Sequence, residues 1–408
     1  MPSILILTQY YPPETGAPQN RLSSLARHLK QSGAEVEVLT AMPNYPAMQV
    51  HGAYRGKWFC KEELDGIPVY RSWIYARKAK GIAVRLLNYF SFVFSSAITG
   101  LFRMKRYDII ICESPPLFLG MSALMIKLFR RTKLVFNVSD LWPESAEKLN
   151  IVNNKIFLKA AYGLEAWLYR RSALVSGQTQ GIVKSIQTRF PKTRTFWLPN
   201  GIDAEKYNIE KVDKTWRQVN GFKENDFIIL YAGILGHAQA LEVILNAANR
   251  LRESDNIKFV IVGDGPQKDF LHSLKAELKL EHVFFFPNQP AANMPAIIYA
   301  SNAAIIPLKN IPLFMGAIPS KIFENLAFAR PILLGVDGEA KELFIEQGKC
   351  GLFFTPDDDA ALAYGTLQLS NDPQLCATLG ANGKAYVYQH FNRANIAAAF
   401  YEELKAIS

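Results

Sequence analysis

The chain has 408 residues, of which 49% are hydrophobic, with ordinary numbers of glycine (25) and proline (22). This length allows two or three domains, each with a buried core, and the composition excludes a mainly disordered, collagen-like or solenoid chain. The net charge of +10 is uneven, because residues 1–204 carry 27 basic and 13 acidic side chains, whereas residues 205–408 carry 19 and 23.

Short apolar runs alternate with longer amphipathic stretches in the first half. We expect strands at 4–8, 36–40, 109–113 and 133–138, and helices near 20–32, 82–103 and 119–129. The first run lacks the basic region and the long apolar region of a signal peptide, so we expect a first strand and a reducing cytoplasmic location. Strands that alternate with helices predict a parallel sheet.

Residues 86–102 form a run of 17 residues without a charge, at the lower limit of a bilayer span. Its polar members recur at three- and four-residue spacing and mark one less apolar face: Asn88, Ser91, Ser95, Ser96 and Thr99. Basic clusters flank the run, at Arg77, Lys78 and Lys80 and at Arg103, Lys105 and Arg106. We expect a helix in the interface of an anionic membrane, the alternative being an ordinary core helix.

The basic excess is concentrated in residues 71–133, which carry twelve basic and two acidic side chains. Such a segment favours contact with a polyanion: a phospholipid surface, a pyrophosphate-bearing substrate or a nucleic acid. A solvated basic surface is the alternative.

A second alternating series follows the polar stretch 203–226. Strands are expected at 228–232, 258–262, 283–286, 303–306 and 332–335, and helices at 240–252, 267–278 and 320–329. The sequence therefore predicts two doubly wound α/β domains, 1–205 and 215–390, with a last helix at 393–408 that packs back on the first. Ligands bind beyond the carboxyl ends of such strands.

Two helix starts are candidate phosphate sites. Gly16 precedes the first helix, where backbone N–H groups and the helix dipole favour an anion; the alternative is an ordinary turn glycine. Lys321 lies in the first turn of another helix, after Ser320, and opposes the dipole there unless an anion docks. We expect Lys321 to bind a diphosphate and Glu324, one turn on, to bind ribose hydroxyls; the alternative is a surface salt bridge between them.

Seven motifs, in this order, resemble glycosyltransferase family 4, and within it the bacterial surface-polysaccharide branch with the N-acetylfucosamine transferases of O-antigen assembly. They are QYYPPE (9–14), MPNYP (42–46), SDLWPES (139–145), LPNGID (198–203), YAG (231–233), GDGP (263–266) and PSKIFE (319–324). The resemblance spans nearly the whole chain. It implies a GT-B fold, two Rossmann-like domains facing across a cleft, with no required metal or cofactor and with retention of the anomeric configuration.

The resemblance also assigns positions. Gly16 lies near the donor phosphates, Lys321 contacts the diphosphate and Glu324 the ribose. The other residues expected at the donor are Gly233, His237, Gly263, Gly265, Asn288, Gly316, Ala317 and Ser320.

The sequence departs from the family pattern at three places. Position 316 is glycine where the family has the first of two glutamates, so we expect the backbone of 314–318 to contact the sugar hydroxyls. Ile234 and Gln239 replace an arginine and a lysine, which leaves more of the diphosphate charge to Lys321. Ser139 replaces a histidine, and Asp140 is then the first-domain group expected at the reacting centre, with a helix N-cap as the alternative.

The expected function is transfer of a sugar from a UDP-N-acetylhexosamine-type donor, such as UDP-N-acetylfucosamine, to a polyprenyl-diphosphate-linked saccharide. The enzyme would associate peripherally with the cytoplasmic face of the inner membrane and would not bind nucleic acid. We expect front-face attack assisted by the leaving phosphate, without a covalent intermediate. The alternatives are a sugar-nucleotide 2-epimerase and a non-catalytic basic protein that binds membranes or nucleic acid.

Other patterns are expected to be structural. The four cysteines form no CxxC pair and lie far apart, at Cys60, Cys112, Cys350 and Cys376. The acidic run 357–359 is expected to cap a helix, and the six histidines show no metal-ligand spacing.

Overall fold

The computed structural model describes residues 1–14, 16–45, 48–78, 81–149, 151–207 and 209–408, and within 81–149 the side chains of residues 82 and 83 are not described. Pro46 and Lys80, which belong to segments singled out above, lie outside the described residues. The chain divides into two compact units. Unit 1 contains residues 1–200 and 393–408, and unit 2 contains residues 201–392.

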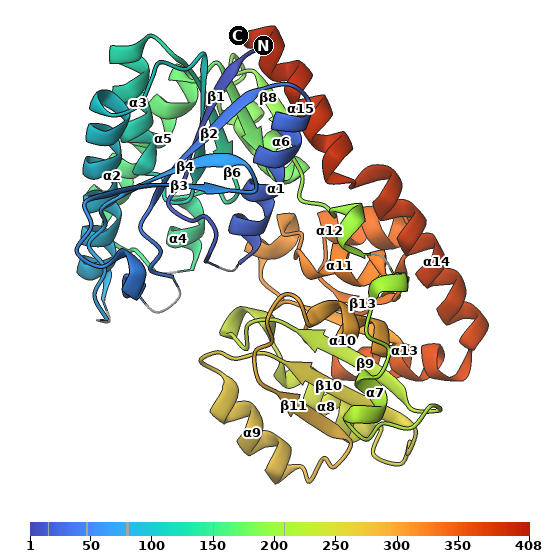
Figure 1. Ribbon diagram of the computed structural model, residues 1–408. Helices are drawn as coiled ribbons and strands as arrows, with labels where there is room; N and C mark the ends of the chain where they lie inside the picture. Colours follow the sequence, from blue (N-terminus) through green and yellow to red (C-terminus); the bar gives the residue numbers. More distant parts are fainter. Residues whose placement is uncertain (15, 46–47, 79–80, 150, 208) are drawn as a thin grey trace. The chain divides into compact units, whose positions relative to one another are not determined.

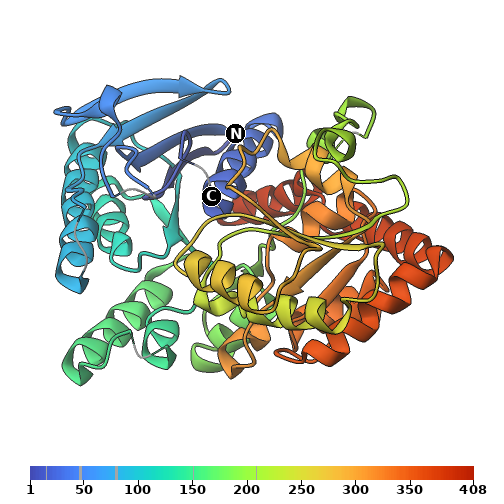
Figure 2. The same cartoon turned by 90° about the horizontal axis from the view of Figure 1, so that it is seen from below.

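Unit 1 is built on an eight-stranded sheet in the order β3-β4-β2-β1-β5-β6-β7-β8 among the described residues. All neighbours are parallel except β3 and β4, an antiparallel hairpin at the sheet edge (Figure 2). The strands are β1 (Ser3–Leu7), β2 (Glu35–Ala41), β3 (Phe59–Leu64), β4 (Ile67–Ser72), β5 (Ile109–Ser114), β6 (Lys133–Val138), β7 (Leu174–Gly177) and β8 (Thr195–Trp197).

Helices cover both faces of this sheet (Figure 1). Leu22, Leu29 and Phe400 belong to the core between the sheet and the helix pair α1 and α15, which pack against each other. Phe92, Leu124 and Leu168 belong to the core on the other face. The helices of unit 1 are α1 (Ala17–Gln31), α2 (Ile82–Phe102), α3 (Leu119–Arg130), α4 (Glu144–Lys148), α5 (Lys155–Arg171), α6 (Gln180–Arg189) and α15 (Arg393–Ile407).

Unit 2 has a six-stranded, entirely parallel sheet in the order β11-β10-β9-β12-β13-β14 within the described chain. The strands are β9 (Phe227–Ala232), β10 (Ile257–Val262), β11 (Val283–Phe286), β12 (Ala303–Pro307), β13 (Ile332–Gly335) and β14 (Gly351–Phe353). The helices are α7 (Trp216–Val219), α8 (Glu242–Arg250), α9 (Lys268–Glu277), α10 (Met294–Ala300), α11 (Lys321–Ala327), α12 (Glu339–Lys341), α13 (Asp359–Asn371) and α14 (Pro373–His390).

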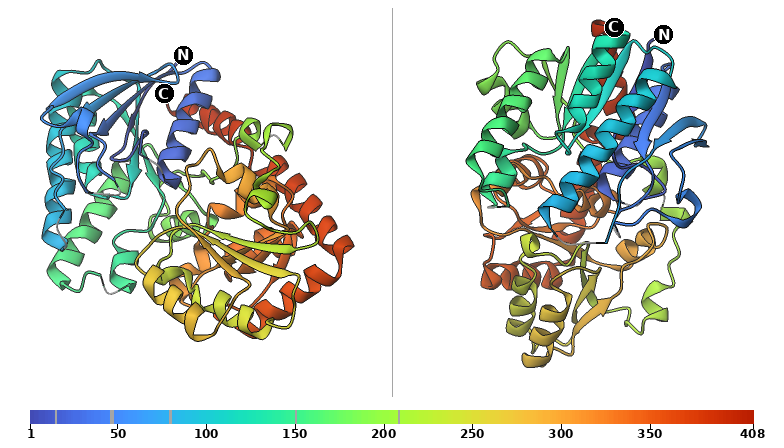
Figure 3. Two further views of the ribbon diagram at one scale, coloured as in Figure 1. Left: turned by 60° about the horizontal axis from the view of Figure 1, so that its bottom comes forward. Right: turned by 90° about the vertical axis from the view of Figure 1, so that its left-hand side faces the viewer.

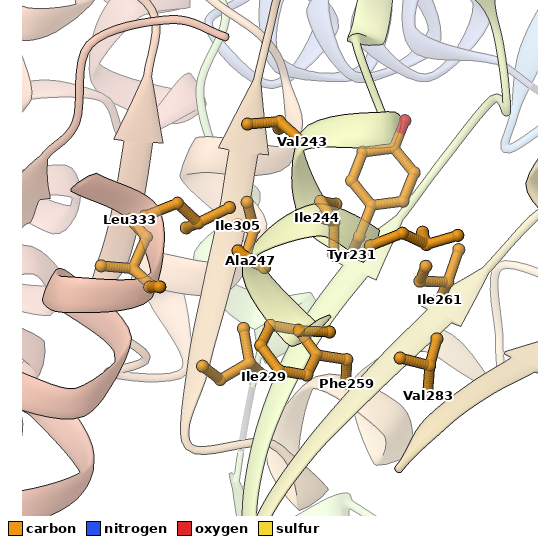
Figure 4. Packing of buried hydrophobic residues seen from close by; sticks show 14 of the residues in the cluster. Ile229, Tyr231, Val243, Ile244, Ala247, Phe259, Ile261, Val283, Ile305 and Leu333 are labelled. Atoms are coloured by element: carbon orange, nitrogen blue, oxygen red, sulfur yellow. The ribbon is translucent and has the colours of Figure 1, made fainter. Parts of the chain in front are cut away.

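The core of unit 2 explains why its strands read as continuous apolar runs. Ile229, Phe259 and Ile305 point from three neighbouring strands toward α8, where Ile244 and Ala247 meet them (Figure 4). A parallel sheet is covered on both faces, so alternate positions of one strand enter two different cores. Its strands run in one direction, and their carboxyl ends therefore form one edge, from which the loops with the predicted donor residues leave.

Candidate functional site

The carboxyl end of β9 brings together a glycine, an aromatic ring and a lysine. Tyr231 is buried, and its hydroxyl donates a hydrogen bond to the Ile234 carbonyl (2.7 Å). Lys321, the first residue of α11, places its Nζ 3.8 Å from the centre of the Tyr231 ring. A Cβ on Gly233 would lie 2.8 Å from the same Nζ, so only glycine allows the ammonium this close to the strand end.

The Lys321 ammonium is held in a poorly solvated place. Desolvation lowers the pKa of Lys321 to about 7, and the Glu324 carboxylate opposes this shift. Keeping this ammonium charged therefore costs free energy, and an anion placed beside it would reduce that cost. This electrostatic arrangement favours an anionic ligand at the carboxyl end of β9.

The ends of β9 and β10 approach each other through backbone atoms. Gly263 has φ of 155°, and a Cβ on it would overlap the Gly233 carbonyl oxygen. The Gly233 N–H donates to the Val262 carbonyl (2.9 Å), and the Leu235 N–H donates to the Asp264 carbonyl (2.9 Å). Both glycines are thus required by close packing, and this part of the edge presents main-chain groups.

Three further predicted residues belong to the same edge. His237 follows β9, and its Nδ1 accepts a hydrogen bond from the Gln267 side-chain amide just before α9. Gly265 donates its N–H to the Asp264 carboxylate (2.8 Å). Asn288 follows β11 and is exposed.

The segment before α11 contains the remaining predicted donor residues. Gly316 ends a short 3₁₀ turn, and nothing lies within 4 Å of a Cβ built on it among the described residues. The Ala317 N–H donates to the Phe314 carbonyl (3.0 Å). Ser320 precedes α11 as predicted, but its hydroxyl makes no capping hydrogen bond within the described chain. The space beside Gly316 is therefore open where a longer side chain would stand.

In unit 1, Asp140 follows β6. Its Oδ2 accepts a hydrogen bond from the Ser145 hydroxyl (2.8 Å). Desolvation raises the pKa of Asp140, and hydrogen bonds from Ser145 and the Leu141 N–H oppose the shift. Helix α4 begins at Glu144, with Pro143 before it, so the alternative that Asp140 is a helix N-cap is wrong.

A buried polar cluster behind Asp140 was not predicted. Arg21 of α1 donates to the Glu113 carboxylate at the end of β5, to the Ser139 hydroxyl (2.6 Å) and to the Gln178 side chain (2.8 Å). The second Glu113 oxygen accepts from Asn137 (2.5 Å). Arg21 and Glu113 are 6% and 3% exposed. Such a pair is costly to bury and costly to break, so it ties α1 to three strand ends. The sequence feature that could have predicted this cluster is a carboxylate, Glu113, at the end of an otherwise apolar strand.

Gly16 lies at the start of α1, where its carbonyl accepts the Asn20 N–H (3.1 Å). The structure thus places Gly16 and Asp140 in unit 1. It places the other predicted site residues in unit 2, in the loops and helix starts that follow β9, β10, β11 and β12.

The acidic run 357–359 is structural, as predicted. Asp358 caps α13 by accepting the Ala361 N–H (2.9 Å), Asp359 pairs with Arg250, and Asp357 accepts the Asn310 N–H (2.9 Å). No three His, Cys, Asp or Glu side chains come together as a metal site in the part of the chain that the structure describes. All four cysteines are free.

Two family models match the chain, one after the other. The glycosyl transferase 4-like domain matches residues 16–201, and glycosyl transferases group 1 matches residues 212–386. The chain is 28% identical over 335 residues to the "Putative colanic acid biosynthesis glycosyl transferase WcaI" of Escherichia coli K12, covering 79% of this chain and 81% of the relative. It is 22% identical over 395 residues to the O-antigen chain mannosyltransferase C of Escherichia coli, covering 96% and 94%.

Solved structures resemble the whole chain. Sucrose-phosphate synthase from Thermosynechococcus elongatus superposes with a TM-score of 0.75 at 17% identity, covering 100% of both chains. Alr3699/HepE of Anabaena, in complex with UDP-glucose, superposes with a TM-score of 0.73 at 20% identity, again over 100% of both. These similarities confirm the predicted GT-B fold of two Rossmann-like α/β domains.

Proposed function

We propose that this chain, which matches the glycosyl transferase 4-like domain over residues 16–201 and glycosyl transferases group 1 over residues 212–386, is a glycosyltransferase. The proposed reaction is transfer of a sugar from a nucleotide sugar to a polyprenyl-diphosphate-linked saccharide in bacterial surface-polysaccharide assembly. The proposed donor is of the UDP-N-acetylhexosamine type, with UDP-N-acetylfucosamine the first candidate. Support for a UDP-sugar comes from Alr3699/HepE, solved with UDP-glucose. Support for polysaccharide assembly comes from relatives named for colanic acid and O-antigen.

The observation that carries this proposal is the Lys321 ammonium beside Gly233. A nucleoside diphosphate brings negative charge, and the desolvated ammonium at the carboxyl end of β9 is suited to receive it. Because Gly233 has no side chain, a diphosphate oxygen would approach the Lys321 ammonium without a Cβ beside it. Glu324, one turn along α11 from Lys321, is the proposed partner of the ribose hydroxyls.

The proposed chemistry follows from the leaving group. The acceptor hydroxyl oxygen forms a bond to the anomeric carbon while the bond from that carbon to the phosphate oxygen breaks, and the hydroxyl proton passes to the departing diphosphate. Negative charge grows on the diphosphate, so Lys321 stabilises the transition state more than the bound donor. Loss of one such group costs about 3 kcal/mol. Retention, metal independence and a sugar-orienting or base role for Asp140 are parts of this proposal.

A thermal-shift screen tests the donor site. UDP-, GDP- and dTDP-sugars are titrated against the parent protein and against Lys321→Ala and Glu324→Ala. We expect one nucleotide to raise the melting temperature of the parent and to do so less in both variants. Lys341→Ala is the matched control, since Lys341 also lies over a ring, 4.3 Å from the centre of Phe353. Equal stabilisation of all four proteins would refute the site.

The stereochemical part is tested separately. The anomeric configurations of donor and product are compared by NMR once the donor is known, and an inverted product would refute retention while leaving the donor site standing.

A further inference from the structure

Helices α2 and α3 lie side by side on the surface of unit 1 (Figure 3, right). Each presents large apolar side chains to solvent at helical spacing. On α2 these are Leu87, Phe90, Phe94 and Phe102, and on α3 they are Met121, Met125, Leu128 and Phe129. We call these eight residues the apolar face. Phe94 is 59% exposed and Phe129 is 73% exposed, so the face is far more open than an ordinary helix-packing surface.

The regularly spaced polar residues of α2 lie on its inner side, where Asn88, Ser95, Ser96 and Thr99 are buried together with Phe92. Asn88 donates to the Tyr75 carbonyl (2.7 Å) and accepts from Gln9 (2.8 Å). The Ser96 hydroxyl donates a hydrogen bond to the Ser122 hydroxyl of α3 (2.9 Å). A surface helix normally turns its apolar side inward. Helix α2 buries Phe92 and Val93 but also leaves Phe90 and Phe94 exposed, so its outer side is suited to an apolar environment outside the protein.

Exposed basic residues lie at both ends of the apolar face. Arg77 and Lys78 precede α2 in the chain and Arg85 lies in its first turn, whereas Arg103, Arg106 and Arg131 follow the C-terminal ends of α2 and α3. Exposed apolar side chains bordered by cations fit an anionic membrane surface. The apolar side chains can contact the lipid acyl chains, and the cations can contact the phosphate headgroups. The charge thus distinguishes an anionic lipid surface from a neutral apolar partner.

The contacts of α2 decide how it would meet the bilayer. Residues 84–102 are the one described stretch long and apolar enough to cross a membrane, by length and composition alone. However, 44% of that stretch is buried inside the protein, and its inward polar groups are hydrogen-bonded to other elements. Crossing would break these bonds in a medium that cannot replace them. Contact in the plane of the interface keeps them.

We propose that the apolar face and its basic rim dock unit 1 on the surface of a membrane that contains anionic phospholipid. Helices α2 and α3 lie along the surface, with their phenylalanine and methionine side chains between headgroups and acyl chains. Through Asn88, α2 is bonded to Gln9 and Tyr75, in the loops that follow β1 and β4. On the proposed function, docking would hold these loops at the level of a lipid-linked acceptor; the docking itself does not depend on that function.

Vesicle flotation tests the proposal with the full chain. The vesicles contain phosphatidylcholine and phosphatidylglycerol in equal parts, or phosphatidylcholine alone. We expect the parent to float with the anionic vesicles, less in high salt. Phe94→Ser combined with Phe129→Ser should lower the partition coefficient by about tenfold or more, because two exposed aromatic side chains lose their apolar surroundings. Phe270→Ser in unit 2, whose side chain is 49% exposed, is the matched control and should float like the parent.

A second variant set tests the basic rim. Arg77→Ala, Lys78→Ala and Arg131→Ala together should weaken binding to anionic vesicles by roughly tenfold or more and flatten the salt dependence, since each charge contributes near the surface. Thermal melts of every variant verify folding. No sugar donor is present, so a protein that floats but does not bind nucleotide sugars refutes only the proposed function.

Three results would overturn the docking proposal. The parent could fail to float, or the double serine variant could float like the parent. Light scattering after gel filtration could also show a lipid-free dimer that the double serine variant dissociates, in which case the apolar face covers a second copy of the chain.

Discussion

If the diphosphate binds the ammonium form of Lys321, raising the pH from 6 to 8 should weaken nucleotide-sugar binding by about tenfold. With a pKa of about 7, Lys321 keeps its proton in about 90% of the molecules at pH 6 and in about 10% at pH 8. The ligand must then supply the free energy of protonation, about 1.4 kcal/mol for a tenfold change. Proton uptake should accompany binding above pH 7.

In the ligand-free protein, the effect of pH on folding stability has the opposite sign to its effect on donor binding. The pKa of Lys321 in the folded protein is lower than the ordinary lysine value, so the unfolded chain binds more protons between about pH 7 and 10.5. The contribution of this lysine to stability therefore rises with pH across that window. Stability and donor binding should change in opposite directions, which separates the two effects.

Isothermal titration calorimetry at pH 6, 7 and 8 measures the predicted change. UDP-N-acetylglucosamine is the probe, because both its phosphates are esterified and lack the monoester proton that leaves near pH 6. Lys321→Arg keeps the charge at all three pH values and should bind with little pH dependence. Lys341→Met is the control and should behave like the parent. Equal parent affinity at pH 6 and 8, or a tenfold change that persists in Lys321→Arg, would refute the reasoning.

Four other predictions follow, three from the packing and one from the proposed role of Asp140. Gly263→Ala should lose about 2 kcal/mol of unfolding free energy in a urea titration, because its φ is 155° and the new Cβ meets a carbonyl; unchanged stability would contradict the close approach. Asp140→Asn should lower turnover about a hundredfold with donor affinity retained, and near-normal turnover would remove its catalytic role. Glu113→Gln should cost about 3 kcal/mol in the same titration, since it leaves a buried guanidinium without its counter-charge; a cost below about 1 kcal/mol would count against the cluster. Phe259→Ala should cost about 4 kcal/mol and exposed Phe270→Ala only about 0.5 kcal/mol, and similar losses would count against the core assignment.

Some elements were easy to predict and others were not, for identifiable reasons. Buried parallel strands such as β5 and β10 are continuous apolar runs between amphipathic stretches, so their positions are visible in the sequence. The hairpin β3–β4 is an edge element with charged positions, and it lacks such a run. Its Asp65–Gly66 turn, with φ of 51° and 73°, was the signal that could have found it.

The sequence by itself determined the fold class and the expected position of Lys321 at the start of a helix, because periodicity, glycine placement and helix-start residues are local properties. It also showed that residues 86–102 combine an apolar run with regularly spaced polar residues. Only the tertiary structure decided that Phe92 faces inward and Phe94 outward, because hydrogen bonds to Tyr75, Gln9 and α3 take up part of the inner side of α2. The pairing of Arg21 with Glu113 likewise joins residues 92 positions apart, and such a contact exists only once the strands are aligned.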